Sequence, residues 1–100
     1  MEARVMAAYL IVDLDIKDAN GFEAYRREVG PTIAKHGGKA VVRNGAFEVL
    51  EGNWQPKSVV ILEFPSMESL KGWYNSPEYK PLIAMRKAAA ATNLVAVEGL

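Results

Sequence analysis

The sequence predicts an α+β, ferredoxin-like domain, an antiparallel sheet with helices on one face. Strand-like apolar runs alternate with segments that have the 3.6-residue period of a helix. Their order is β-α-β-β-α-β, with an extra hairpin elaborating the second strand. Because the chain has only 100 residues, half of them hydrophobic, we expect one domain over residues 1–100 with a core from about 6 to 99.

The first strand is predicted at residues 6–16, "MAAYLIVDLDI", which are apolar and rich in branched side chains. The period changes to helical from residue 18, where Asn20 and Glu23 have the spacing of a capping box. One apolar stripe follows, made of Phe22, Tyr25, Val29 and Ile33.

Two glycine-containing pairs are expected to shape this helix. Gly30-Pro31 predicts a kink or a fresh helical turn, since proline has no N–H to donate. Gly37-Gly38 predicts the end of the helix, because glycine readily takes the left-handed conformation found there.

The middle of the chain is predicted to be β-structure. Residues 39–52, "KAVVRNGAFEVLEG", contain two strand-like runs around Asn44-Gly45, a strong hairpin signal. A loop containing Pro56 follows, and residues 58–64, "SVVILEF", have the composition of a central strand.

Two helices and a strand complete the prediction. Residues 65–76 form a short helix with Ser66 as its N-cap. The next helix starts at Ser76 as N-cap, with Pro77 in the first helical position. Residues 93–99, "NLVAVEG", form the last strand.

The two central strands are apolar on both faces. In residues 58–64, Val59 and Ile61 point one way while Val60 and Leu62 point the other. Helices cover one face only, and leaving the other wet would cost several kcal/mol at about 25 cal/mol per Å². We therefore predict a homodimer in which two sheets pack face to face, forming a dimeric α/β barrel.

Composition excludes several classes of function. Twelve basic residues balance twelve acidic ones, so no basic field would attract nucleic acid or a membrane. The chain has no cysteine, which excludes disulfides and thiol chemistry and favours a cytoplasmic location. No cofactor is expected. Nucleotide phosphate binding has no support, because no glycine-rich loop opens a helix after a strand.

Long motifs resemble a known family. The stretches "KHGGKAVVRNG" and "VLEGNWQPKSVVILEFPSMESLKGWYNSPEY", with the later Arg86, are similar to the family catalogued as domain of unknown function 1330. The resemblance implies the dimeric α/β-barrel superfamily, whose other branches include cofactor-free monooxygenases, isomerases and polyketide cyclases. It implies a fold and no settled activity.

His36, the only histidine, has two interpretations. It is a candidate general base, since its unperturbed pKa lies near neutrality. It is also placed to end a helix, and this structural interpretation is the one we favour. One histidine without cysteine makes a poor zinc site, because Glu48 or Glu63 would have to complete it, so no metal is expected.

Arg43 and Glu63 are charges in predicted strands, where each must be paired or face a cavity. They form either an ion pair, Arg43 with Glu63 or with Glu48, or a pocket floor that grips an anion. Arg86 shares a helical stripe with Tyr79 and either extends to the helix edge or reaches into the helix–sheet cleft.

Three aromatic residues are further candidates. Trp73 and Tyr74 are adjacent and point about 100° apart on a helix, so one can be core while the other lines an opening. Trp54, in a loop before a proline, is either an interface anchor or a lid.

Three functions remain open. The first is a binding protein for a small aromatic or carboxylate ligand, in a cleft lined by these candidates. These are Tyr25, His36, Arg43, Glu63, Trp73, Tyr79 and Arg86. The second is a cofactor-independent enzyme of monooxygenase, isomerase or cyclase type, in which His36 or Tyr74 moves a proton and Arg86 holds an enolate. The third is an interaction module without chemistry, for which the helix–sheet interface would be dry and fully packed.

Overall fold

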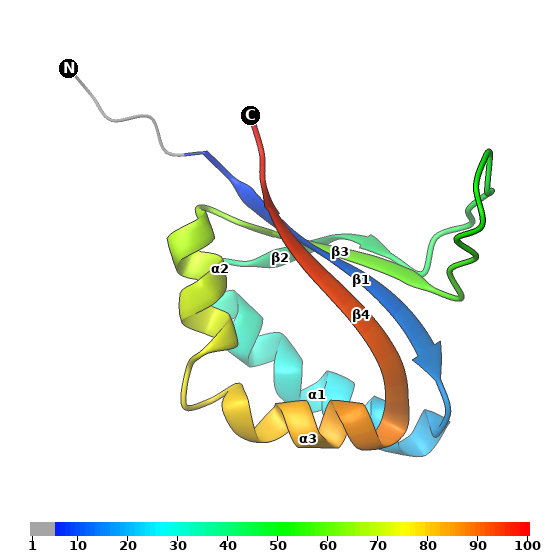
Figure 1. The fold of residues 1–100 in the computed structure, drawn as a ribbon. Coiled ribbons are helices and arrows are strands. Elements are labelled where there is room, and N and C mark those ends of the chain that lie inside the picture. The colour runs from blue at the N-terminus through cyan, green and yellow to red at the C-terminus, as the bar shows by residue number, and fades with distance from the viewer. Residues whose placement is uncertain (1–5) are drawn as a thin grey trace.

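A computed structural model describes residues 6–100 of the chain. Within them, a four-stranded antiparallel sheet of order β2-β3-β1-β4 has its helices on one face (Figure 1). The elements, in chain order, are β1 (Ala8–Ile16), α1 (Ala19–Lys35), β2 (Lys39–Arg43), β3 (Val59–Phe64), α2 (Met67–Tyr74), α3 (Lys80–Ala89) and β4 (Ala90–Glu98). The predicted α+β, ferredoxin-like class is confirmed.

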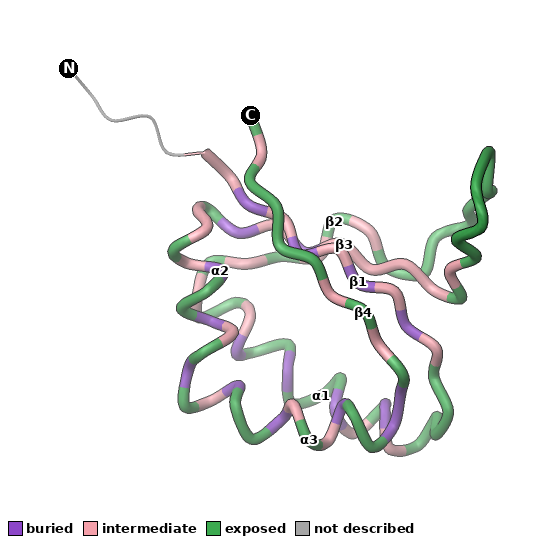
Figure 2. The backbone as a smooth tube through the Cα atoms, in the orientation of Figure 1, coloured by how far each residue is buried: buried purple, intermediate pink, exposed green. Residues whose placement is uncertain are grey.

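The core lies between the helices and the sheet, where Figure 2 shows the buried residues of both layers. Alternate residues of β1 point into it, and Leu10 and Val12 pair in register with Leu62 and Val60 of β3. The helices contribute buried side chains along one stripe each. These are Phe22, Tyr25, Val29, Leu70, Trp73 and Leu82.

The opposite face of the sheet is also apolar, and no helix of residues 6–100 covers it (Figure 1). Register places Ile11 of β1 beside Ile61 of β3 and Val95 of β4 on this face. Val95 is 58% exposed and Val97 is 44% exposed. We call this surface, made of Tyr9, Ile11, Val42, Val59, Ile61, Val95 and Val97, the open face.

Helix α1 differs from the prediction in two details. Its N-cap is Asp18, whose Oδ1 accepts a hydrogen bond from the Gly21 N–H at 3.1 Å, so the capping box at Asn20 is wrong. The helix also runs through Pro31, so the fresh turn, one of the two alternatives expected at Gly30-Pro31, does not form. Because Gly30 and Pro31 are exposed, water can satisfy the carbonyl that proline leaves without a donor.

The hairpin predicted at Asn44-Gly45 is absent from the described chain. Asn44 does have a left-handed φ of 55°, but it ends β2, and β2 pairs directly with β3. Residues 45–57, which we call the arm, contain no strand and extend away from the sheet (Figure 1). A lone two-stranded hairpin is marginal in water, so the strand-like residues 46–50 gain little by pairing here.

Helix α3 begins later than predicted. Ser66 caps α2 as expected, since its Oγ accepts a hydrogen bond from the Ser69 N–H at 3.0 Å. Ser76 instead stabilises a turn before α3, accepting from the Tyr79 N–H at 3.2 Å and donating to the Trp73 carbonyl at 2.8 Å. Helix α3 starts at Lys80, and its proline is Pro81.

Candidate functional site

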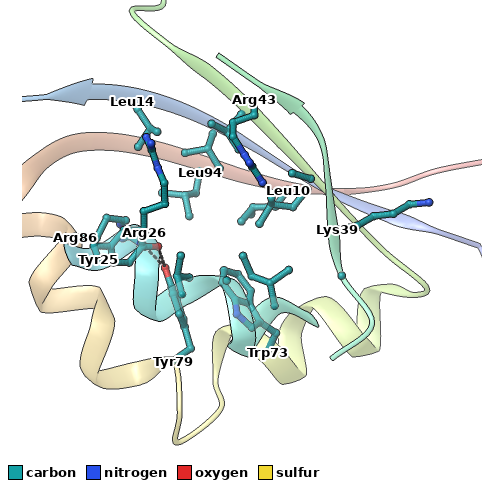
Figure 3. A pocket seen from close by; sticks show the side chains of 18 of the residues that line it. Leu10, Leu14, Tyr25, Arg26, Lys39, Arg43, Trp73, Tyr79, Arg86 and Leu94 are labelled. Carbon is teal, nitrogen blue, oxygen red and sulfur yellow. Dashed lines mark hydrogen bonds between the residues drawn. The ribbon is translucent and has the colours of Figure 1, made fainter. Parts of the chain in front are cut away.

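A cavity of about 400 Å³ lies between the sheet and the helices (Figure 3). Its walls are mainly apolar side chains from β1, β3 and α1. Its polar lining residues are Tyr25, Arg26, Lys39, Arg43, Asn44, Tyr79 and Arg86. No Asp, Glu or His is among the lining residues in the described part of the chain. The cavity is therefore positively charged in a protein whose net charge is zero.

Arg86 and two tyrosines form one wall of the cavity. Arg86 is 3% exposed, and its Nη1 donates a hydrogen bond of 2.6 Å to Tyr79 Oη. Tyr79 Oη is in turn 2.9 Å from Tyr25 Oη. Arg86 Nε is buried and has no partner among residues 6–100. A buried cation thus rests on neutral oxygen atoms, with one donor left free.

The folding of α3 explains why Arg86 is inside. Leu82, Arg86 and Ala89 follow each other at helical spacing and are all buried, so they form the stripe that faces the core. Arg86 occupies a position in this stripe where an apolar residue would be expected. Its long side chain passes through the core and brings the guanidinium to the cavity.

A rigid aromatic wall holds Tyr79. Its ring centroid lies 4.1 Å from that of Trp73, and both residues are almost fully buried. Trp73 Nε1 donates to Thr32 Oγ1 at 3.0 Å, and Thr32 donates to the Val29 carbonyl at 2.7 Å. These contacts tie α2 and the turn before α3 to α1, so the phenol of Tyr79 has a fixed position.

The electrostatics of this wall keep the phenol of Tyr25 neutral and the guanidinium charged. Burial, and then the neighbouring Tyr79, raise the pKa of Tyr25 far above its ordinary value of 10.0. Burial alone lowers the pKa of Arg86, but Tyr79 and Tyr25 outweigh it and raise that pKa. The wall therefore offers hydrogen-bond donors and one positive charge at neutral pH.

Three further cations lie among the lining residues. Figure 3 shows Arg43 pointing from the sheet into the cavity, Arg26 extending from α1 toward the sheet, and Lys39 pointing away. Lys39 Nζ lies 3.5 Å from Glu63 Oε1, and Arg26 Nη1 lies 3.5 Å from Glu23 Oε2. Arg43 makes no ion pair with any residue from 6 to 100.

The structure places His36, one of the candidates, outside the cavity. It follows the last residue of α1, and its Nε2 lies 3.3 Å from Glu78 Oε1, which Lys35 also approaches at 3.2 Å. Gly37 follows with a left-handed φ of 79°. His36 thus links the end of α1 to the turn before α3 and is not among the residues that line the cavity.

Glu63 and Tyr74 also lie away from the cavity. Glu63 is on the sheet face opposite the helices, where Tyr9 donates to it at 2.9 Å, so the expected pair with Arg43 does not form. Glu48 is in the arm and forms no ion pair with Arg43 within residues 6–100. Tyr74 contacts Trp73 and lines a second, separate hollow against β4.

Four candidates therefore line the cavity with Arg43: Tyr25, Trp73, Tyr79 and Arg86. Arg26 and Asn44 also line the cavity and are not among the candidates expected from the sequence. The signal for Arg26 was its place next to Tyr25 on the helix, which lets a long side chain bend over the cavity rim. Asn44 carried a turn signal that concealed its position at the end of β2.

Metal-binding clusters and membrane-spanning helices are both absent from the described residues. Residues 6–100 contain no group of three or more His, Asp or Glu side chains able to hold a metal ion. Among the same residues, no helix combines the length and hydropathy needed to cross a membrane.

Comparisons with known proteins define the fold. A family model described as a domain of unknown function (DUF1330) matches residues 7–100. The protein of unknown function RPA0582 from Rhodopseudomonas palustris is similar at a TM-score of 0.79 and 23% identity, over 97% of this chain and 85% of that one. No curated protein matches the chain.

Two more distant structures share the fold. SnoaB, a cofactor-independent oxygenase from Streptomyces nogalater, is similar at a TM-score of 0.67 and 12% identity, over 96% of this chain and 95% of that one. A dimeric protein of unknown function with a ferredoxin-like fold, from Bacteroides fragilis, is similar at 0.52 and 14% identity, over 93% and 96% of the chains. At these identities the likeness concerns the fold alone.

Proposed function

The chain belongs to the family described as a domain of unknown function (DUF1330), and we propose that it binds a small organic acid between its helices and its sheet. One observation carries the proposal. Arg86 is buried at 3% exposure, lines the cavity, and has no carboxylate partner among residues 6–100. Its Nε is a donor without an acceptor.

A buried guanidinium without a counterion is an expensive arrangement. Burying a charge costs several kcal/mol, roughly, unless an opposite charge and hydrogen bonds offset that cost. Tyr79 supplies one neutral acceptor and no negative charge. A carboxylate or phenolate in the cavity would supply the missing charge and an acceptor for Nε.

The remaining walls suit an aromatic or otherwise apolar acid. They include Leu10, Val12, Phe22 and Leu62, with the rings of Trp73 and Tyr79 at one side. Pockets for small ligands commonly have such apolar walls with a few convergent polar groups. The cavity volume of about 400 Å³ suits a ligand of one or two rings.

The direct test is calorimetry with benzoate, cinnamate and salicylate, each paired with its neutral amide. At least one acid should bind the wild type more tightly than its amide does, and Arg86→Met should weaken that acid about tenfold or more. Arg27→Met is the matched control, because Arg27 is exposed on α1 and outside the cavity. If no acid exceeds its amide, the proposal is wrong.

The proposal includes a homodimer that covers the open face. Ile11, Ile61 and Val95 form an apolar surface there, and a neighbour of similar fold is described as dimeric. The exposed arm residues Phe47 and Trp54 add apolar surface that a second copy can cover. The proposal also includes a cytoplasmic location, which is consistent with a chain that lacks cysteine. It includes a single domain over residues 1–100, which is consistent with the short length of the chain.

Sedimentation tests the dimer. The wild type should sediment as a dimer at micromolar concentration, and Val95→Glu should sediment as a monomer, because it places a charge on the open face. Ala88→Glu adds the same charge on an exposed position of α3 and should remain dimeric. A monomeric wild type would remove the dimer from the proposal.

A cofactor-independent enzyme is the second candidate, favoured by the Arg86–Tyr79–Tyr25 chain of hydrogen bonds. Such donors stabilise the negative charge of a developing enolate or phenolate. No lining residue in the described chain is a carboxylate or histidine base, so this role is limited to substrates that enter already ionised. Turnover of a bound acid, measured by mass spectrometry, separates the enzyme from the binding protein.

An interaction module without a ligand is the third candidate. That function predicts a dry, fully packed interface between helices and sheet. The cavity and its unpaired cation favour the first two functions over this one.

A further inference from the structure

Arg43 reaches the cavity because of an irregularity in β2. Ala40 pairs with Leu62, but Val42 pairs with Ile61 and Arg43 with Val60, so one extra residue interrupts the register. Leu62 and Val60 both point toward the helices. The bulge at Val41 therefore turns Arg43 to the helix side, whereas strict alternation from Lys39 would leave it on the open face.

The end of β2 is held in this orientation by the residues that follow. Asn44 takes a left-handed φ of 55°, and its N–H donates to the Val59 carbonyl at 3.0 Å. Its side-chain oxygen accepts a hydrogen bond from the Ser58 hydroxyl. The backbone that carries Arg43 is thus fixed to β3, while its side chain has no ion-pair partner within residues 6–100.

Arg43 and Arg86 approach the cavity from different sides. Arg43 is on β2, at one edge of the sheet, and Arg86 is on α3, which leads directly into β4 at the other edge. In the view of Figure 3, Leu94 and the side chain of Arg26 lie between Arg86 and Arg43, and Leu10 lies beside the end of Arg43. One cation is buried and the other is exposed at the rim.

We infer that Arg43 is a second anion-binding residue of the cavity, and that its ligand class is an aromatic dicarboxylic acid. One carboxylate lies at Arg86 and the other at Arg43, with the ring against the apolar walls between them. No lining carboxylate competes for either cation in the described chain. This inference rests on the proposed function and adds the second acid group to it.

Calorimetry with matched acids tests the second site. Terephthalate is compared with benzoate, and p-carboxycinnamate with cinnamate, so that each pair differs by one carboxylate and the two pairs differ in length. At least one dicarboxylate should bind the wild type about tenfold tighter than its monoacid, which corresponds to about 1.4 kcal/mol. Arg43→Gln should remove this advantage and leave the monoacid within about twofold.

Two variants complete the design. Arg43→Lys keeps the charge and should restore part of the advantage, which excludes a folding defect as the cause. Arg27→Gln, on the exposed side of α1, should leave the tighter binding of the dicarboxylate over its monoacid unchanged in both acid pairs.

The outcomes separate the two proposals. If monoacids bind through Arg86 but neither dicarboxylate binds more tightly, the inference is wrong and the proposed function stands. The inference is also wrong if the advantage survives Arg43→Gln. If no acid binds in any form, both proposals fail.

Discussion

Arg86 Nη1 donates a 2.6 Å hydrogen bond to the hydroxyl of Tyr79, and no carboxylate of residues 6–100 forms an ion pair with this guanidinium. The charge is almost fully buried, so most of its stabilisation has to come from polar groups within the protein. Tyr79 and Tyr25 provide two such groups in series. The stability of this wall therefore depends on the hydrogen-bonded hydroxyls of Tyr79 and Tyr25. Its proposed affinity for an acid depends on the charge of Arg86 and on its Nε, which has no acceptor among residues 6–100.

Tyr79→Phe should destabilise the protein. The substitution removes the acceptor of Arg86 Nη1 and the partner of Tyr25 Oη, so buried polar atoms lose hydrogen bonds. We expect the free energy of unfolding to fall by about 1–3 kcal/mol. Urea denaturation measures the change.

Tyr74→Phe is the matched control for that substitution. Tyr74 packs against Trp73 and Tyr79 but lines the second hollow, and its hydroxyl has no hydrogen-bond partner in the described chain. Its loss should change the unfolding free energy by less than about 0.5 kcal/mol. Equal effects of the two substitutions would mean that the hydrogen bonds of Tyr79 contribute nothing.

Arg86→Met should leave the unliganded protein about as stable as the wild type, or more so. Methionine fills a similar volume and removes a buried charge that has no counterion, which often stabilises a protein by about 1–4 kcal/mol. Thermal and urea denaturation of the unliganded variant test this. A loss above about 3 kcal/mol would identify Arg86 as a structural residue, contrary to the ligand-binding role.

Gly38→Ala should destabilise the end of α1. A Cβ at Gly38 would lie 2.5 Å from Phe64 Cε2 and 2.7 Å from Ile33 Cγ2, and Phe64 is fully buried. Overpacking of this kind costs about 1–3 kcal/mol. Gly72→Ala is the control, because Gly72 is exposed in α2 and a Cβ added there would meet no atom within 4 Å. Alanine at this position should raise the free energy of unfolding by about 0.5–1 kcal/mol. A stable Gly38→Ala variant would contradict the tight packing at β2.

The contact between Glu78 and the end of α1 should weaken in acid. Hydrogen bonds from Lys35, from the backbone and from His36 hold the pKa of Glu78 below its ordinary value of 4.5. A depressed carboxyl pKa stabilises the fold fully above pH 4.5, and that stabilisation is lost as the pH falls through the lower, folded-state value.

A double-mutant cycle measures this effect. Lys35→Met, Glu78→Gln and the double variant should show favourable coupling at neutral pH, because Lys35 Nζ lies 3.2 Å from Glu78 Oε1. The coupling should shrink below pH 4.5, as Glu78 becomes protonated. Coupling that does not change with pH would show that the ion pair contributes nothing to stability.

The fold could be predicted from local patterns because its central strands and helix stripes are strongly periodic. Residues 8–16 and 59–64 are strands, and Phe22, Tyr25 and Val29 face the core as expected. The start of α1 was predicted wrongly because two polar residues compete for the N-cap position, and the sequence pattern does not distinguish Asp18 from Asn20. The hairpin was predicted wrongly because a turn signal does not show whether the two flanking segments can pack against a further strand or helix, which a stable hairpin needs.

The candidate site could be predicted only in part. Tyr25, Tyr79 and Arg86 meet because helical spacing brings them to the core, and spacing is visible in a sequence. The placement of Arg43 depends on a bulge, and that of His36 on where the turn before α3 passes. Both are set by tertiary contacts between segments far apart in the chain, which no local pattern records.

The bulge at Val41 has a consequence for how such a cavity changes between related chains. The pairs on either side of the extra residue already alternate, since Ala40 pairs with Leu62 and Val42 with Ile61. A one-codon deletion of Val41 would therefore remove the bulge and leave Arg43 on the helix side. A shift of the extra residue to a position beyond Arg43 would instead move this cation to the open face. Chains of this fold can in this way lose one cation of the cavity through strand register alone, while the amino acids that line it remain identical.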